Sequence, residues 1–185
     1  DISHSLSAVP HVILVKNRDN SNNENWCMYH HKNTSAPETD FLKLNVAGAT
    51  ADEVEIWSDE VPTSSVFTIG RQDAINTSSG NHIAFLWSEK QGFSKFGVYT
   101  GNGNADGVFI YTGFRPAWVM IKNNNLAGSK HWGIHDTKRD TYNPSLLQID
   151  ADDNYAEFSS VNRAFDILSN GFKIRSSDSD HNTDG

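Results

Sequence analysis

The sequence predicts an all-β protein with a β-sandwich fold, of a jelly-roll or concanavalin-like kind, and three observations point to it. Short runs of Val, Ile, Phe, Tyr and Trp alternate with clusters of Asn, Gly, Ser and Asp, as in all-β domains. No window of ten or more residues has a clear helical period, although 50–55 could hold one turn. The chain also contains two copies of one pattern. A closed barrel is the alternative architecture.

The repeat begins with Pro10–Asn17, PHVILVKN, which is followed 106 residues later by Pro116–Asn123, PAWVMIKN. Three further matches keep the same spacing: Trp26 with Trp132, Lys32 with Lys138, and Asn76–Thr77 with Asn182–Thr183. The sequence therefore predicts one β repeat over residues 1–91 and a second over residues 92–185.

Each copy has a block with no counterpart in the other copy. The first has nothing that matches Phe96–Gly101, and the second has nothing that matches His82–Trp87. We expect the first repeat to lack its first strand, the second to lack its last strand, and the chain to be part of a longer polypeptide. Decay of the repeat at its ends is the alternative. The copies form either two domains or one fused sandwich in which each completes the other's sheet.

The apolar runs define the predicted strands in chain order. These are His11–Lys16, Trp26–His31, Phe41–Val46, Glu53–Trp57, Val66–Ile69, His82–Ser88, Phe96–Thr100, Gly107–Thr112, Ala117–Lys122, His131–His135, Leu146–Ile149, Ala164–Leu168 and Gly171–Arg175. Val12–Val15 and Trp118–Ile121 are continuously apolar, so we expect central strands that are covered on both faces. Glu53–Trp57 alternates with period two, which predicts one wet face. Asn22–Asn25, Asn123–Gly128 and Gly101–Gly107 have the composition of hairpin turns.

Composition excludes several classes of protein. The single cysteine, Cys27, allows no disulfide within the chain and no cysteine-rich metal site. The net charge is −8 and the basic residues are scattered, which argues against a nucleic-acid partner. No run of 18 apolar residues occurs, so no membrane span is expected.

One loop has the oxygen spacing of a calcium site. Asn102, Asn104 and Asp106 alternate and are followed by Gly107, as in the first half of a calcium-binding loop. The later acidic ligand is missing, because Thr112 stands at its position. An ordinary Asn/Gly turn explains the same residues, so calcium is kept only as a candidate cofactor.

The acidic run Asp150–Asn154 is a second candidate with a solvated loop as its alternative. His131 and His135 lie too far apart on a strand to share zinc.

Catalysis has little support in the sequence. There is no Gly-x-Ser-x-Gly motif, and the carboxylates cluster in loops rather than in apolar surroundings that would raise their pKa. We therefore expect a protein that is not an enzyme.

Sugar binding needs a flat apolar ring beside polar side chains. Trp57, at the end of an alternating strand, and Tyr142, after a polar loop, are the predicted ligand-binding residues.

The block GFSKFGVYTGNGNADG over residues 92–107, followed by VFIYTGFRP over 108–116, resembles a repeat in virion proteins of marine tailed phages. These proteins, from cyanophages especially, are tail-fibre-like. Val12–Arg18 and Leu168–Arg175 are similar to other blocks of the same family. The resemblance implies a virion, extracellular location and other virion proteins as partners. It carries over no catalytic or ligand-binding residue.

The sequence thus favours a non-enzymatic module of a phage appendage that attaches to a host cell-surface polysaccharide. A purely structural decoration or fibre-shaft module is the first alternative, and a secreted glycan-processing enzyme is the second. A homo-oligomer is left open.

Overall fold

The computed structural model describes residues 1–19, 24–126, 128 and 130–184. Strands dominate it, with only three short helical turns among these residues. The chain divides into two units: unit 1 comprises residues 1–89 and 96–98, and unit 2 comprises residues 90–95 and 99–185. The predicted hairpin tips Asn22–Asn25 and Asn123–Gly128 each lie partly outside the described residues.

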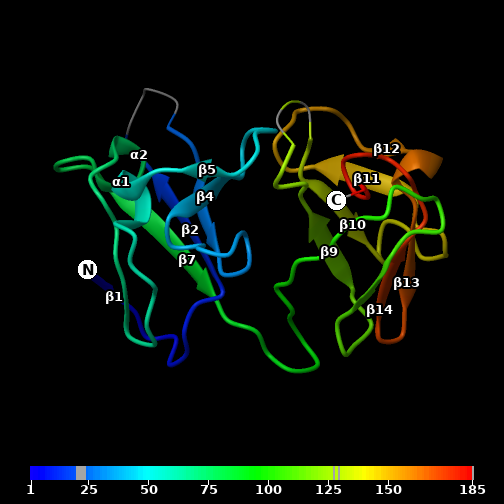
Figure 1. The fold of residues 1–185 in the computed structure, drawn as a ribbon, viewed down its shortest axis with the longest axis horizontal. Coiled ribbons are helices and arrows are strands. Elements are labelled where there is room, and N and C mark those ends of the chain that lie inside the picture. The colour runs from blue at the N-terminus through cyan, green and yellow to red at the C-terminus, as the bar shows by residue number, and fades with distance from the viewer. Residues whose placement is uncertain (20–23, 127, 129, 185) are drawn as a thin grey trace. The chain divides into compact units, whose positions relative to one another are not determined.

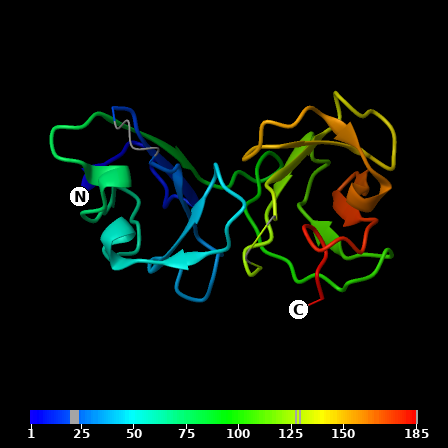
Figure 2. The ribbon, with the colours of Figure 1, turned by 90° about the horizontal axis from the view of Figure 1, so that it is seen from above.

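Unit 1 is built on a five-stranded antiparallel sheet with strand order β5-β4-β3-β2-β7, beside a separate pair of β1 and β6. Its elements are β1 (Ile2–Ser3), β2 (Val12–Asn17), β3 (Cys27–His30), β4 (Asp40–Lys43), β5 (Ala51–Asp52), α1 (Val54–Trp57), β6 (Val66–Phe67), α2 (Asp73–Asn76) and β7 (His82–Trp87). Figures 1 and 2 both show α1 and α2 on the same face of the sheet. The buried core of unit 1 comprises Ile13, Val15, Cys27, Tyr29, Phe41, Ile56, Trp57, Phe67, Ala74 and Ile75.

Unit 2 has two antiparallel sheets, one of order β12-β11-β10-β9 and one of order β13-β14-β8. Its elements are β8 (Phe109–Tyr111), β9 (Trp118–Ile121), β10 (Gly133–Asp136), β11 (Leu147–Asp150), β12 (Phe158–Ser159), the 3-10 turn η1 (Val161–Arg163), β13 (Phe165–Leu168) and β14 (Gly171–Ile174). Val119 and Ile121 of the first sheet share one core with Phe165, Ile167, Phe172 and Ile174 of the second. The predicted all-β, sandwich-like fold is confirmed.

The repeat in the sequence is also a repeat of strand register. In unit 1, Val12–Val15 pair antiparallel with Cys27–His30, so that Val12 lies opposite His30. In unit 2, Trp118–Ile121 pair with Gly133–Asp136 in the same register, 106 residues later at every position. Equal spacing in both members of each pair means that the two copies fold the same hairpin.

A buried asparagine closes the hairpin of unit 1 onto its last helical turn. Asn17, at the end of β2, is 2% exposed. Its Nδ2 donates to the carbonyl oxygen of Asp73 at 3.0 Å and to the hydroxyl of Thr77 at 2.8 Å. The side chain therefore supplies donors to a turn whose carbonyl has no partner within a strand ladder.

Asn123 does the same in unit 2. Its Nδ2 donates to the carbonyl oxygen of Ser179 at 2.8 Å and to Thr183 Oγ1 at 3.2 Å, which are the positions 106 residues after Asp73 and Thr77. This explains why Thr77 and Thr183 match, and Asn76 and Asn182 match because their Nδ2 atoms donate to the equivalent carbonyls of Gly70 and Ser176.

The two strands predicted to be central differ in outcome. β2 lies between β3 and β7, and Val12, Ile13, Leu14 and Val15 are all buried, as predicted. β9 pairs only with β10 among the strands of the described chain, and Trp118 is 55% exposed. The prediction of a central strand at Trp118–Ile121 is therefore wrong. A continuous apolar run indicates that its side chains favour burial. It does not show that another strand pairs on each side.

Glu53–Trp57, predicted to be a strand, forms the helical turn α1 instead. The turn points both Ile56 and Trp57 into the core, whereas successive residues of a strand would point to opposite faces. Its carbonyls bind a second segment: Gly70 N donates to the oxygen of Ile56 at 2.7 Å. Glycine is needed there, because a Cβ on Gly70 would lie 2.1 Å from the carbonyl oxygen of Glu55.

Phe96–Thr100 is not a strand either. Phe96 N donates to Glu89 Oε1 at 3.0 Å, and the carbonyl of Phe96 accepts from His31 Nε2 at 2.9 Å. The side chains of Glu89 and His31 thus bond the amide and the carbonyl of Phe96, which a strand ladder would otherwise have used. The first strand is instead β1 in the first copy and β8 in the second. The two strands are equivalent, because β1 pairs with β6 as β8 pairs with β14.

Replacing Asn17 by alanine should lower the free energy of unfolding of unit 1 by about 1–3 kcal/mol, because the two part-buried hydrogen bonds that its side chain donates are then lost. Hydrogen exchange of β2 and β3 amides measures this loss, while exchange in unit 2 should not change. Asn125→Ala is the matched control, since that side chain is exposed. Equal effects of the two substitutions would contradict the role of Asn17.

Candidate functional site

The structure corrects the first predicted ligand-binding residue. Trp57 is only 2% exposed and packs edge-on against Tyr29, with ring centroids 6.0 Å apart and an interplanar angle of 80°. The alternating pattern suggested a half-exposed strand, but α1 turns this ring into the core of unit 1. Trp57 is a core residue and is unavailable to a ligand.

The second predicted residue, Tyr142, is on the surface and 82% exposed. It lies two residues before Pro144, which lines an open pocket of about 450 Å³ on unit 2. The described lining residues are Pro144, Leu146, Val161, Ala164, Asp166 and Arg175. The pocket thus combines an apolar wall with one ion pair, in which Arg175 Nε lies 2.6 Å from Asp166 Oδ2.

The candidate calcium ligands are used within the loop itself. Asn102 Oδ1 accepts from Asn104 N at 3.1 Å, and Asn104 Oδ1 accepts from Asp106 N at 2.8 Å. Asp106 Oδ1 lies 2.7 Å from Lys173 Nζ, and this contact lowers the pKa of the Asp106 carboxyl. These bonds are those of successive Asx turns, which the sequence offered as the alternative. Calcium binding at this loop stays a prediction.

The acidic run Asp150–Asn154 is also engaged within the protein. Asp150 Oδ1 accepts from Gln148 Nε2 at 2.6 Å, and Asp152 Oδ1 accepts from Trp132 N at 2.8 Å. Across the described residues, no group of three or more His, Cys, Asp or Glu side chains is arranged to hold a metal ion.

The exposed aromatic surface with the best-defined geometry lies on β7, the edge strand of unit 1. Ile83, Phe85 and Trp87 point to one face of the sheet because they occupy alternate positions, and they are 38%, 40% and 40% exposed. The rings of Phe85 and Trp87 lie side by side, with centroids 6.0 Å apart and an interplanar angle of 18°. We call these three residues the β7 aromatic strip.

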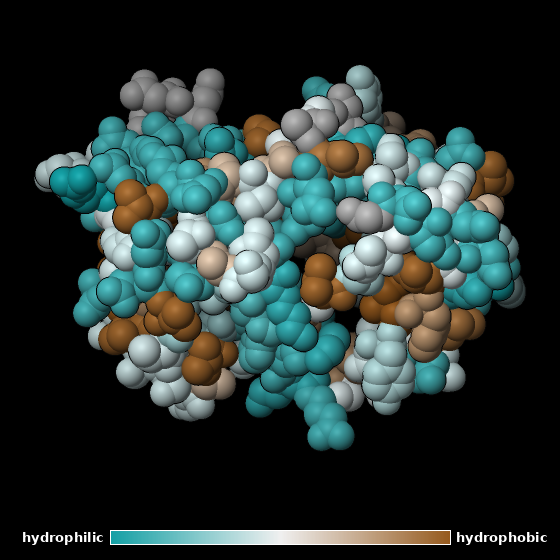
Figure 3. Space-filling model, in the orientation of Figure 1, coloured by the Kyte–Doolittle hydropathy of each residue, from teal (hydrophilic) through white to brown (hydrophobic). Residues whose placement is uncertain are grey.

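The β7 aromatic strip lies beside buried residues of β2. Trp87 lies opposite Val12 and Phe85 lies opposite Leu14, which are 5% and 7% exposed. A ring that packs beside a buried neighbour has fewer orientations open to it, so less conformational entropy is lost when a ligand stacks on it. In Figure 3, hydrophobic residues form separate patches among hydrophilic surface on the face in view.

Sequence reasoning placed Phe85 and Trp87 on a strand but did not select them. The signal was present but incomplete, since large apolar residues at 83, 85 and 87 alternate with His82 and Ala84, whereas Leu86 breaks the alternation. What it lacked was the position of the strand: a central strand would have buried these rings, and only the edge position exposes them.

A second unusual feature is a polar cluster inside unit 2. His135, Gln148, Asp180 and His181 are between 0% and 3% exposed. The equivalent residues of unit 1 are Tyr29, Phe41, Ala74 and Ile75, all members of its apolar core. Phe41 matches Gln148 at a spacing of 107, because Lys43 pairs with Cys27 as Asp150 pairs with Gly133. The same fold is therefore stable with an apolar interior, and the polar interior is a property of unit 2 alone.

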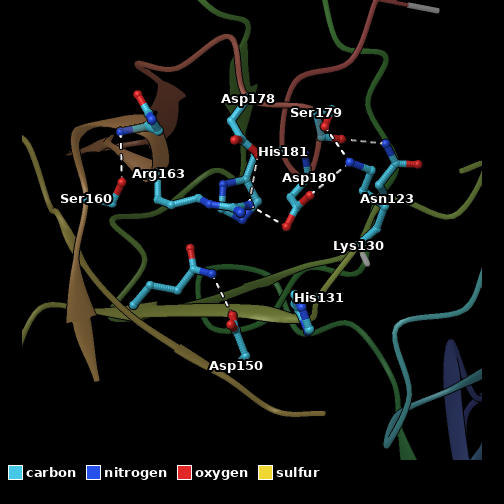
Figure 4. A network of polar contacts seen from close by, with 12 residues as sticks. Asn123, Lys130, His131, Asp150, Ser160, Arg163, Asp178, Ser179, Asp180 and His181 are labelled. Atoms are coloured by element: carbon cyan, nitrogen blue, oxygen red, sulfur yellow. Dashed lines mark hydrogen bonds and ion pairs between the residues drawn. The ribbon is translucent and has the colours of Figure 1, made fainter. Parts of the chain in front are cut away.

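Arg163, the last residue of η1, brings a charge to this cluster. Its Nη1 lies 2.9 Å from Asp178 Oδ1 and 2.5 Å from Asp180 Oδ2. Figure 4 shows its side chain running beside the ring of His181 toward these carboxylates. Neither ring nitrogen of His181 has a hydrogen-bond partner among the described residues. A Cβ on Gly133 would lie 2.6 Å from His181 Nε2, so glycine leaves room for this ring.

Burial is the main reason that both histidines resist protonation. It lowers the pKa of His135 to about 4, although a hydrogen bond between its Nε2 and Gln148 Oε1 opposes this. The pKa of His181 is lowered well below its ordinary value, by burial first and by the Arg163 charge second. Since both rings are inaccessible, the cluster can govern the stability of unit 2 but cannot meet a substrate.

Together these features define a duplicated all-β module with an exposed aromatic edge strand and one polar interior. In the described chain, none of the helices has the length and apolar character needed to cross a membrane. The whole chain, residues 1–185, matches the model of DUF7483, a domain family of unknown function, and the protein belongs to that family. Comparison with curated proteins and with solved structures gave no match.

Acidification should destabilise unit 2 through its buried histidines. Unfolded histidine binds a proton near pH 6.5, whereas the folded rings stay neutral to a lower pH, so stability is complete above pH 6.5 and falls below it. The expected loss at pH 5 is about 2 kcal/mol for each ring. Hydrogen exchange of β13 and β14, followed from pH 7 to pH 5, measures it.

His181→Ile installs the residue found at the equivalent position of unit 1 and should reduce this slope in unit 2. Unit 1 has its own pH dependence, because burial lowers the pKa of His30 to about 4, and this should be unaffected by the substitution. An unchanged slope in β13 and β14 would exclude His181 as a source.

Proposed function

We propose that this protein is a non-enzymatic adhesion module of a phage appendage, such as a tail fibre, and that it binds a host cell-surface polysaccharide through the β7 aromatic strip. The observation that carries the proposal is the pair of exposed, nearly parallel rings of Phe85 and Trp87 on an edge strand. The resemblance of residues 92–116 to tail-fibre-like virion proteins supports an extracellular, virion setting.

Sugar recognition needs an apolar plane for the C–H face of the ring and polar groups for the hydroxyls. The two rings supply the plane, and a linear polysaccharide presents successive sugars to rings that lie side by side. Polar groups flank the strand: Asp19 Oδ2 accepts from Asn81 N at 2.8 Å just before β7, and Glu89 follows it.

A weak single site is sufficient for this role. A fibre that presents several copies of a module gains avidity from their high effective concentration, without any new contact. The binding surface of one copy can therefore be small, as the three-residue β7 aromatic strip is.

The structural fibre role is a second candidate, and one observation favours it. Phe109, Tyr111 and Trp118 of unit 2 are 45%, 65% and 55% exposed, which is apolar surface that neighbouring subunits could cover. The glycan-processing alternative has less support, because Asp166 is the one carboxylate among the described lining residues of the open pocket, and glycoside hydrolysis uses two.

The test is binding of residues 1–185 to an array of bacterial polysaccharides and oligosaccharides, once with calcium and once with chelator. The unmodified protein should bind saturably, and the double substitution Phe85→Ala and Trp87→Ala should weaken binding at least tenfold, which is about 1.4 kcal/mol. Loss of binding with chelator would assign calcium to the loop of Asn102, Asn104 and Asp106.

Phe93→Ala is the matched control, because this ring is 81% exposed but lies outside the strip. Tyr142→Ala tests the open pocket separately. Binding that survives the double substitution and disappears with Tyr142→Ala would move the site to unit 2. An array without binding, together with self-association in light scattering, would favour the structural role.

A further inference from the structure

The two copies differ in one feature of their sheets. β2 of unit 1 has a neighbour on each side: it pairs with β3 and, over its whole length from Val12 to Asn17, with β7. β9 is the same strand of the second copy and pairs with β10 in the same register. Its other edge pairs with no strand of the described residues.

The alternation of an antiparallel ladder identifies the backbone groups at this open edge. Thr137 N donates to the carbonyl of Ala117 at 3.0 Å, so Ala117 faces β10. Hydrogen-bonding groups alternate between the two sides of a strand, which turns Val119 and Ile121 toward β10. The amides of Trp118 and Met120 therefore point to the open edge.

Unit 1 shows what lies at the equivalent edge. Trp118 and Met120 correspond to Val12 and Leu14, whose opposite residues in β7 are Trp87 and Phe85. Arg18, two alternations beyond Leu14, donates its amide to the carbonyl of Asn81 at 2.8 Å, which confirms that even-numbered residues face β7.

Side-chain burial gives independent support. On the inner face, Val119 and Ile121 are 7% and 5% exposed, close to the 0% and 3% of Ile13 and Val15 in unit 1. On the other face, Trp118 is 55% exposed, whereas its counterpart Val12 is 5% exposed. The two copies thus match in their cores and differ on the side that β7 occupies in unit 1.

We propose that the open edge of β9 accepts an additional antiparallel strand with the alternating apolar pattern of β7. The partner is an extended segment, not among the described residues, that places large apolar side chains beside Trp118 and Met120. Its carbonyl and amide groups pair with those of the same two residues. Strand addition of this kind takes affinity from main-chain hydrogen bonds and specificity from alternate side chains.

The experiment appends a copy of Gly80–Glu89 directly after residue 185 of the full chain. This continues the 106-residue spacing, and Thr183 Oγ1 bonds the Ser179 carbonyl as Thr77 Oγ1 bonds that of Asp73, so the added segment starts from an equivalent turn. NMR hydrogen exchange at pH 7 then compares the amides of β9 with and without the extension. We expect exchange at Trp118 and Met120 to slow at least tenfold relative to Val119 and Ile121.

The matched control carries proline in the appended copy at the positions that copy Ile83 and Phe85. Ile83 lies opposite Lys16 and Phe85 opposite Leu14 in unit 1, so their copies would donate to Lys122 and Met120, and proline has no amide hydrogen. This control should exchange like the unmodified chain. Equal exchange at Trp118 and Met120 in all three proteins would overturn the proposal. Protection of these two amides in the unmodified chain that rises with protein concentration would also overturn it, because a second copy would then occupy the edge.

Discussion

Each unit depends on the hydrogen bonds that one asparagine makes at the end of the repeated hairpin. Asn17 and Asn123 join the last residue of an apolar run to a turn about sixty residues further along the chain. Without that tie, the hydroxyl of Thr77 or Thr183 would remain as a donor to the turn carbonyl, but each unit would lose the two hydrogen bonds that the asparagine side chain donates. The same tie thus holds the turn against the hairpin in both units.

On this common frame the two units fill their interiors differently. Unit 1 uses aromatic and aliphatic side chains, which is the arrangement that apolar burial favours. Unit 2 places Asp180 and two histidines at equivalent positions and pairs Asp180 with Arg163, although a buried ion pair contributes less than a well-packed apolar core of the same volume. Unit 2 should therefore be the less stable and more acid-sensitive half, and the difference is chemical rather than topological.

The surface features divide in the same way. The β7 aromatic strip exists because β7 ends the sheet of unit 1, so that Phe85 and Trp87 have buried β2 residues beside them on one side only and are 40% exposed. The open edge of β9 exists because no described strand takes the place of β7 in unit 2. The position of β7 thus accounts for both surfaces. In unit 1, β7 occupies this position and exposes its rings. In unit 2, no described strand occupies it, so backbone donors and the ring of Trp118 are left at the edge.

The sequence by itself determined the all-β class, most strand positions and the duplication, because period-two apolar runs and repeated spacing are local properties of the chain. It also located Tyr142 at the surface, next to a polar loop. Tertiary structure alone decided that Glu53–Trp57 forms a helical turn and buries Trp57, since the core needs two adjacent side chains on one side. It likewise decided which apolar strand is central and which is at an edge, and that choice exposes Phe85, Trp87 and Trp118. The physical reason is that a residue's sequence neighbours fix its backbone preference, whereas its exposure depends on which distant strand packs beside it.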